Sequence, residues 1–523
     1  MKKIILVFVL LSSVFSQIFS QDLNDVFWYN DEELNGSARY TATAGAIGSS
    51  GSDLSAVSDN PAGSVYFVTN RFSWSPSIYH LNNTTDYFGQ TSQTQDLSIY
   101  HRLFRTAQIG LVLPYISSAS DWNKIAFGFN MRLLRSYDNH FSMAGINGDG
   151  LDITQYFLAH AQGIPTGDLN IGTLESFDGV YEWLGENYGS SAQKAFLAYQ
   201  GYLIDPVSND QNNTDYVSNA SHAGGVRHRL DMEIFGKKHV TDFFVAGEYK
   251  KKLALGLSFQ KQGLNLTRNR TLQEDGYDAH SVLQSVKYQT QLKTDADGYG
   301  FKIGLMYKLI PSIRLSLAYH SPVWWTVKET LHEILYSESL DRDDLDGDGN
   351  TDEINYFDLN PEQTNVYQPY RYISPGKTMA GMTFIFQKSG LISFHYTYTD
   401  WGQTHLSLDD GSEGDYFKAL NRLIRDNYTA VHTLSVGGEL KVDDFSLRAG
   451  YSYRTSPYRY VKDLTTENIS FGVGYDFGSV EVDFAAVTIK RKMTEQLFPV
   501  GLTSVYDIRK TGSLYTLTMR YNF

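Results

Sequence analysis

Apolar and polar residues alternate in short segments from about residue 64 to the C-terminus. In the segment 465–477, the odd positions from Ile469 to Phe477 are apolar or aromatic, while the even positions from Asn468 to Asp476 are Asn, Ser, Gly and Asp. A period of two predicts β-strands with one apolar and one polar face. A soluble sandwich has the same pattern, so alternation alone leaves open whether the apolar face meets protein or lipid.

The lengths of the connections between strands favour an apolar face that meets lipid. Tight junctions near Lys250 and Asp443 alternate with long connections, of about 80 residues after Ala144 and about 30 after Tyr336, and outer-membrane barrels have this asymmetry between periplasmic turns and extracellular loops. Aromatic residues also gather near strand ends, where an interfacial girdle would lie. The last segment ends on Phe523, which resembles the terminal aromatic residue of outer-membrane barrels.

The junctions divide the chain into about fourteen strands, an even number that returns both termini to one side of the membrane. The expected fold is all-β: a 14-stranded antiparallel transmembrane β-barrel, residues 64–523. Its large extracellular loops are expected at about 145–226, 337–365, 408–430 and 498–511. The strands are expected near residues 65–80, 95–116, 122–143, 227–249, 252–271, 281–309, 312–336, 366–387, 391–407, 431–442, 444–457, 465–477, 479–497 and 512–523.

Residues 1–20 have the pattern of a secretory signal peptide. Lys2 and Lys3 form a basic start, Ile4–Leu11 is an unbroken apolar stretch, and small Ser20 precedes the expected cleavage point. We therefore expect the mature protein to leave the cytoplasm.

Composition narrows the function. The chain has no cysteine, which excludes disulfides, cysteine-ligated metals and a thiol nucleophile. Its formal charge of -14 argues against a nucleic-acid partner. A mean hydropathy of -0.32, with no long apolar run beyond the N-terminus, excludes a helical membrane bundle.

The segment before the first strand, residues 21–63, is rich in Gly, Ala, Ser and Thr. Its composition alone is typical of a linker, but small residues also pack closely inside a narrow lumen. An early Ala-Gly-Ala element at 44–46 is followed by Asp53-Leu-Ser-Ala-Val-Ser-Asp59 and then by Asn60-Pro61-Ala62. This order resembles the FadL-type family of long-chain fatty acid and toluene/xylene transporters.

The resemblance implies that residues 21–63 form a hatch inside the barrel, with Asn60, Pro61 and Ala62 in the gating element. It implies passive uptake of hydrophobic small molecules, long-chain fatty acids or aromatic hydrocarbons, across the bacterial outer membrane. The expected partners are this ligand, the membrane lipids and lipopolysaccharide. We expect a monomer that requires no cofactor.

Two other classes of function were weighed. A related barrel could serve as a docking or shuttle component of a protein secretion system, which a stable partner protein would reveal. An enzyme is not expected, because the sequence has no Gly-x-Ser-x-Gly elbow, no His-Glu-x-x-His helix and no phosphate-binding loop.

The connection between Leu151 and Ile204 is helix-like and rich in large apolar residues. One interpretation is the small core of a loop cap, and the other is an apolar groove that captures ligand. The groove candidates are Phe157, Leu158, Phe177, Tyr181, Trp183 and Leu184.

An acidic stretch matches part of a calcium loop. Hard cations prefer several oxygen ligands folded around them, and Gly349 would permit the sharp turn. Position 12 is Asn355 instead of the usual Glu, so a solvated acidic loop is the alternative. The candidate ligands of this structural Ca²⁺ are Asp344, Asp346, Asp348, Asn350 and Asp352.

Overall fold

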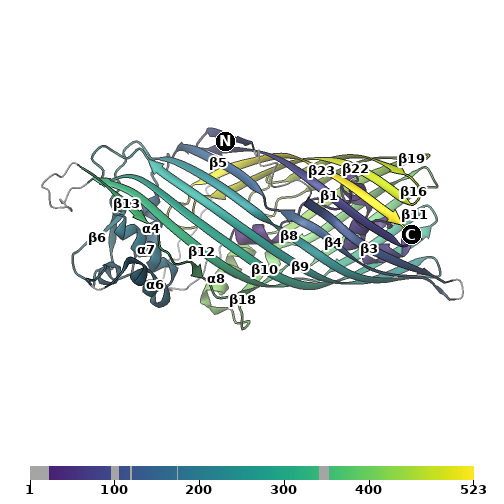
Figure 1. The fold of residues 1–523 in the computed structure, drawn as a ribbon, viewed down its shortest axis with the longest axis horizontal. Coiled ribbons are helices and arrows are strands. Elements are labelled where there is room, and N and C mark those ends of the chain that lie inside the picture. The colour runs from purple at the N-terminus through teal and green to yellow at the C-terminus, as the bar shows by residue number, and fades with distance from the viewer. Residues whose placement is uncertain (1–22, 96–104, 118–119, 174, 341–352) are drawn as a thin grey trace.

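The strands of the computed structural model form a closed antiparallel cylinder (Figure 1). The structure describes residues 23–95, 105–117, 120–173, 175–340 and 353–523. Neighbouring strands are hydrogen-bonded around the cylinder, and β1 (Arg71–Tyr87) pairs with β23 (Val505–Asn522), which closes the sheet. The predicted 14-stranded antiparallel barrel is confirmed.

The barrel wall is built from long strands and from pairs of shorter strands that continue one another. In order around the barrel they are β1, β3 (Arg105–Ile116), β4 (Trp122–Ser136), β8 (Arg227–Tyr249), β9 (Leu253–Asp275), β10 (Leu283–Ile310), β11 (Ile313–His320) with β12 (Val323–Leu340), β15 (Tyr370–Ser374) with β16 (Lys377–Phe386), β17 (Gly390–Asp400), β19 (Ala430–Val442), β20 (Phe445–Arg454), β21 (Thr466–Asp476), β22 (Val480–Gln496) and β23. Shorter strands pair with the wall strands and extend the sheet beyond them. They are β2 (Gln90–Gln95), β5 (Asn139–Ile146), β13 (Ile354–Leu359), β14 (Asn365–Val366) and β18 (His405–Leu408).

Several predicted strand boundaries are wrong. Pro322 separates β11 from β12, and Pro375 separates β15 from β16, because proline has no N–H to donate to the ladder. The strand predicted at 391–407 gives way to the 3-10 turn η4 (Trp401–Gln403). The first strand begins at Arg71 instead of near residue 65, since the residues before it are helical. The number of strands around the barrel is unaffected by these boundary errors.

The outer face of the barrel is apolar. Its exposed side chains include Phe243, Leu257, Phe259, Phe301 and Ile303, and they come from adjacent strands. A soluble monomer rarely exposes a contiguous apolar patch larger than a few hundred Å². This apolar outer face, which we call the apolar belt, therefore faces lipid, and the barrel crosses a membrane. In the described part of the chain, no helix is long and apolar enough to span one.

The wall is much taller on one side. Strands β8 and β9 have 23 residues each and β10 has 28, whereas about 9–11 residues suffice to cross a bilayer. These strands are therefore longer than a bilayer requires, and they run toward the end of the barrel that carries the helices α4 to α7 (Figure 1).

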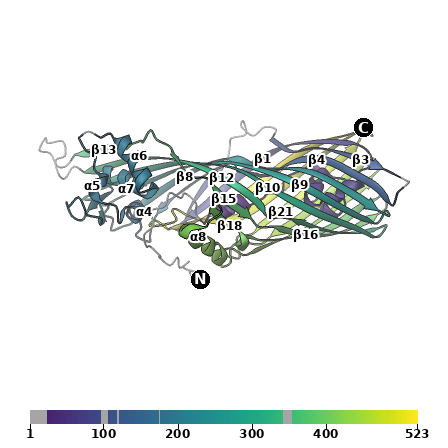
Figure 2. The ribbon, with the colours of Figure 1, turned by 90° about the horizontal axis from the view of Figure 1, so that it is seen from below.

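A helical cap occupies this tall end of the barrel (Figure 2). We define the cap as the described residues of 147–226. Its core is continuous with side chains from the barrel strands and from α1 (Asp25–Asn30). A separate helix, α8 (Gly414–Asn427), lies beside β18. The cap elements are α4 (Ile153–Ala161), α5 (Thr166–Leu169), α6 (Phe177–Asn187), α7 (Ser190–Gln200), β6 (Ile204–Pro206) and β7 (Tyr216–Ser218).

Residues 23–67, which we call the N-terminal segment, lie inside the barrel, in purple in Figure 1. Side chains begin its helices: Ser37 Oγ accepts from the Tyr40 N–H, and Asp53 accepts from the Ser55 and Ala56 N–H groups. Nearly every residue of the segment is buried. Its elements are α1, α2 (Ala38–Ala42), η1 (Ala46–Ser49), α3 (Leu54–Asp59) and η2 (Pro61–Tyr66).

Phe259 provides a test of the lipid-facing surface. It is 52% exposed and lies between Phe243 of β8 and Phe301 of β10. Phe259→Arg should lower the free energy of unfolding in phospholipid bilayers by about 2–4 kcal/mol, because a lipid-facing charge loses its hydration. Phe259→Leu, the control, should cost less than about 1.5 kcal/mol. Equal stability of the two variants in urea unfolding would show that this face does not contact lipid.

Candidate functional site in the barrel lumen

Asn60, Pro61 and Ala62 join α3 to η2 and lie against the inner barrel wall. The Asn60 amide donates to the backbone oxygens of Leu305 at 3.2 Å and Leu317 at 3.4 Å. The Asn60 Oδ1 accepts from the Ala62 N–H at 3.1 Å. The one side chain therefore begins η2 and fixes it to β10 and β11.

Two wall glycines make this close approach possible. A Cβ on Gly256 would lie 2.3 Å from the Ala62 nitrogen, and one on Gly304 would lie 2.1 Å from the Asn60 Oδ1. Both distances are far below van der Waals contact, so any larger side chain would displace the segment. The residues predicted to gate form a packed junction with the wall, and their gating role stays a prediction.

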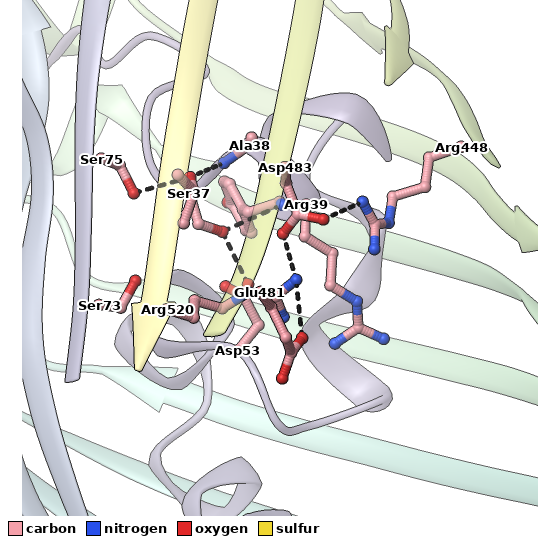
Figure 3. A network of polar contacts seen from close by, with 12 residues as sticks. Ser37, Ala38, Arg39, Asp53, Ser73, Ser75, Arg448, Glu481, Asp483 and Arg520 are labelled. Atoms are coloured by element: carbon pink, nitrogen blue, oxygen red, sulfur yellow. Dashed lines mark hydrogen bonds and ion pairs between the residues drawn. The ribbon is translucent and has the colours of Figure 1, made fainter. Parts of the chain in front are cut away.

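A chain of alternating charges connects α2 to the adjacent wall formed by β19 to β23 and β1, and Figure 3 shows part of it. Buried charges are costly unless paired, and here cations and carboxylates alternate along the network. The Ala38 N–H also donates to Thr518 Oγ1 at 2.6 Å. The ion pairs are Arg39–Glu439 at 2.7 Å, Glu439–Arg448 at 2.8 Å, Arg448–Asp483 at 2.7 Å, Asp483–Arg520, Arg520–Glu481 at 3.0 Å and Glu481–Arg71 at 2.7 Å.

Asp59, at the end of α3, forms a second attachment. Its carboxylate pairs with Arg132 of β4 at 2.9 Å and accepts from the Tyr40 hydroxyl at 2.6 Å. Its backbone oxygen lies 2.8 Å from His320 Nε2 of β11. Strands on different sides of the lumen therefore hold the same residue of the segment.

Asp31, directly after α1, forms a third attachment. Three guanidinium groups surround its fully buried carboxylate: Arg135 at 3.0 Å, Arg454 at 2.8 Å and Arg491 at 2.8 Å. The arginines come from β4, β20 and β22. We call these four residues the Asp31 cluster.

A cavity of about 180 Å³ lies between the N-terminal segment and the inner faces of β1, β4, β16, β17 and β19 to β23. It is smaller than the roughly 300–1,000 Å³ typical of drug-sized ligand sites, although an apolar cavity of about 150 Å³ can hold benzene. A second cavity, of about 20 Å³, adjoins it toward α1. Both are lined by Trp401, Val431, Arg454, Thr466 and Arg491. The charged residues of the larger cavity are Glu32, Glu33, Asp59, Arg132, Lys377, Arg454, Arg491 and Lys510.

The six predicted groove residues lie in the cap. Phe157, Tyr181 and Leu184 are buried in its core, Leu158 and Phe177 pack against that core, and Trp183 is 44% exposed beside Tyr188. Five of the six therefore contribute to the core that holds the cap together. Their role as a ligand groove stays a prediction.

The predicted calcium ligands, Asp344 to Asp352, lie outside the described residues, as does the predicted signal peptide. Among the residues that the structure describes, no group of three His, Asp or Glu side chains is placed to hold a metal ion. The loop predicted at 337–365 includes β13, which pairs with β12.

The charges that hold the N-terminal segment in the lumen were missed in the sequence. Arg448 and Arg454 do stand on the polar face of an alternating strand, which is the available signal for a lumen position. Their partners, Glu439 and Asp31, are on another strand and in the N-terminal segment. Only closure of the barrel brings them together.

A closed transmembrane barrel whose lumen is filled by its own N-terminal segment is a plugged barrel. No family model matches the chain, and no curated protein sequence matches it. Solved structures do match. A Pseudomonas aeruginosa FadL homologue aligns over 94% of this chain and 100% of its own, at 14% identity and a TM-score of 0.52. This likeness shows that the chain has the FadL-type fold.

Two further solved structures align with the chain at lower TM-scores. The Ralstonia pickettii toluene transporter TbuX covers 94% of this chain and 99% of its own, at 13% identity and a TM-score of 0.48. The P. putida toluene transporter TodX covers 94% of this chain and 99% of its own, at 14% identity and a TM-score of 0.46.

Gly256→Val tests the junction at Asn60 to Ala62. The added side chain has no room beside Ala62, so we expect faster amide hydrogen exchange in residues 54–66 of the purified protein. Gly438→Val is the control, because the nearest atom to a Cβ there, the Leu391 oxygen, is 3.7 Å away. Unchanged exchange in Gly256→Val would contradict close packing at this junction.

His160 makes the cap sensitive to acid. Burial, and then the nearby Lys194, lower the pKa of His160 from 6.5 to about 3. In an unfolded cap His160 would bind a proton below about pH 6.5, whereas in the folded cap it stays neutral down to a much lower pH. The stability of the cap should therefore fall as the pH drops from about 7 to 4.

The measurement is hydrogen exchange of α4 and α7 as a function of pH. His160→Gln removes the titrating group and can still hydrogen-bond Ser191, the partner of His160 at 3.1 Å. We expect a weaker pH dependence in this variant. Superimposable pH profiles would contradict the assignment to His160.

Proposed function

We propose that the protein is an outer-membrane channel for the passive uptake of hydrophobic small molecules, with the N-terminal segment as its hatch. One observation carries this proposal: the segment fills the lumen of a lipid-facing barrel and leaves a cavity beside itself. An aqueous porin lumen would give apolar molecules no favourable environment. The larger cavity of this lumen offers the aromatic and aliphatic side chains Tyr79, Leu81, Leu134, Met379 and Ile489 beside its charged groups, so an apolar molecule finds contacts there that water does not provide.

The solved structures that align with this chain include two toluene transporters and a FadL homologue. Long-chain fatty acids or monoaromatic hydrocarbons are therefore the ligand classes that we propose for this chain. The predicted export signal and the lipid-facing barrel support the bacterial outer membrane as the location.

The attachments of the segment indicate how it could move. Its α2, α3 and η2 elements are held by the alternating ion pairs, by Asp59 and by the junction at Asn60. Asn30 and Glu32 to Leu34 line the cavity, and the anchors of this part of the segment include Asp31 and Glu32. We propose that this part moves first, since a ligand in the cavity can reach it without breaking the other attachments.

Transport needs no energy source under this proposal. A molecule passes if successive sites bind it with comparable affinity, so that no site retains it. The cap core, continuous with the upper lumen, would have to loosen before a ligand enters from that end.

Planar bilayers test the hatch. We expect negligible ion conductance from the full mature chain and a stable open pore after deletion of residues 23–67, because the segment fills the lumen. Equal conductance of the two proteins would contradict the assignment of the hatch.

Cells producing the full chain should also take up labelled oleate or toluene faster than cells with an empty vector. Uptake at the vector rate for both compounds would contradict the proposed function.

A further inference from the structure

The Asp31 cluster differs from the other ion pairs of the lumen in its ratio of charges. Cations and carboxylates alternate in the network around Arg39, whereas three guanidinium groups converge on the single carboxylate of Asp31. The arginine side chains are 3%, 19% and 7% exposed, and Asp31 is fully buried. This is the geometry of an anion site occupied by a side chain of the protein itself.

The neighbouring acids are engaged elsewhere. Glu32 pairs with Lys377 at 2.5 Å and lies 3.7 Å from Lys238, and Glu33 accepts from the Ser136 N–H at 3.3 Å. In the described part of the chain, the Arg135 Nε–H finds no hydrogen-bond acceptor. The arginines therefore retain capacity to bind an anion beyond what Asp31 satisfies.

Aromatic rings surround the same guanidinium groups. Arg135 lies over Phe27, Trp28 and Tyr137 at 4.8–5.4 Å from the ring centroids, and Arg491 lies 4.8 Å from the Phe27 centroid. Weakly hydrated guanidinium groups on aromatic faces suit a ligand that has an anionic head and an apolar body.

The cluster also stands where the two cavities meet. Arg454 and Arg491 line both of them, and the smaller cavity is walled by Phe27, Trp28, Trp401 and Tyr458. A ligand head at the arginines would therefore have apolar wall on one side and the larger cavity on the other.

We propose that Asp31 is an internal competitor for this anion site, and that an organic carboxylate displaces it and thereby frees the start of the N-terminal segment. This inference rests on the proposed function. One carboxylate replaces another, so the three arginines keep an anion throughout the exchange and no buried cation is left unpaired. A neutral molecule of the same shape cannot make the exchange, because its entry would leave the arginines paired with Asp31.

The displacement is coupled to the hatch by the chain itself. Asp31 is the C-cap of α1, and its own N–H donates to the Phe27 oxygen at 3.2 Å. Movement of its side chain therefore loosens the end of α1 and removes one attachment of the stretch leading to α2, while Glu32, Asp59 and Asn60 remain attached.

The test uses two single-ring probes of similar size, which suit the 180 Å³ cavity: 4-ethylbenzoate and 4-ethylbenzyl alcohol. Binding to the full mature chain in lipid nanodiscs is measured by calorimetry. In Asp31→Asn, which removes the competing charge, we expect 4-ethylbenzoate to bind at least about tenfold more tightly, and the alcohol to change less than about twofold. No gain for the benzoate, or an equal gain for both probes, would overturn the inference.

Glu32→Gln is the matched control, because it removes the adjacent carboxylate, which pairs with lysines. We expect a gain of less than about twofold for the benzoate. A gain as large as that of Asp31→Asn would assign the effect to general charge in the lumen and overturn the inference.

A second measurement needs no variant and so does not depend on whether Asp31→Asn folds. Hydrogen exchange of residues 31–43 in the unaltered protein should accelerate with 4-ethylbenzoate and not with the alcohol. The same response to both probes, or no response to bound benzoate, would overturn the role of Asp31. If both probes bind and oleate or toluene is taken up, the proposed function survives that failure. If neither probe binds and uptake is absent, both proposals fail.

Discussion

The structure depends on one constraint: inside a bilayer, every backbone N–H and C=O group must be paired within the protein. The pairing of β1 with β23 satisfies it by removing the last free edges of the sheet. Closure then assigns one face of each strand to lipid and the other to the lumen. The apolar belt and the polar interior are two consequences of the same pairing.

A closed barrel of this size encloses space that has to be filled or left to water. Here the N-terminal segment fills much of it, and the lumen charges are arranged to receive it. Arg39 joins Glu439 on one wall, Asp59 joins Arg132 on another, and Asp31 joins arginines from three strands. Because desolvated charges are costly unless paired, the wall and the segment depend on each other.

The attachments differ in kind, and under the proposed function this gives the segment a fixed part and a part that responds to ligand. At Asn60 the contact is a close backbone approach over glycines, where a ligand has no room. At Asp31 the contact is a carboxylate among guanidinium groups at the border of two cavities, where a ligand with the same chemistry could take its place. Under the proposed function, the lumen therefore holds the hatch at Asn60 and releases it at Asp31.

The sequence by itself determined the barrel, because alternation along a strand is a local property that records which face meets lipid. The resemblance to the FadL-type family singled out the segment before β1 and its Asn60-Pro61-Ala62 junction, whose composition alone is typical of a linker. Pro322 and Pro375 are the local signals for the two strand breaks that the structure shows. Only the tertiary structure decided the site: Asp31 and Arg454 are 423 residues apart, and nothing local to either reveals the other. Such an ion pair exists only once the sheet has closed around the segment.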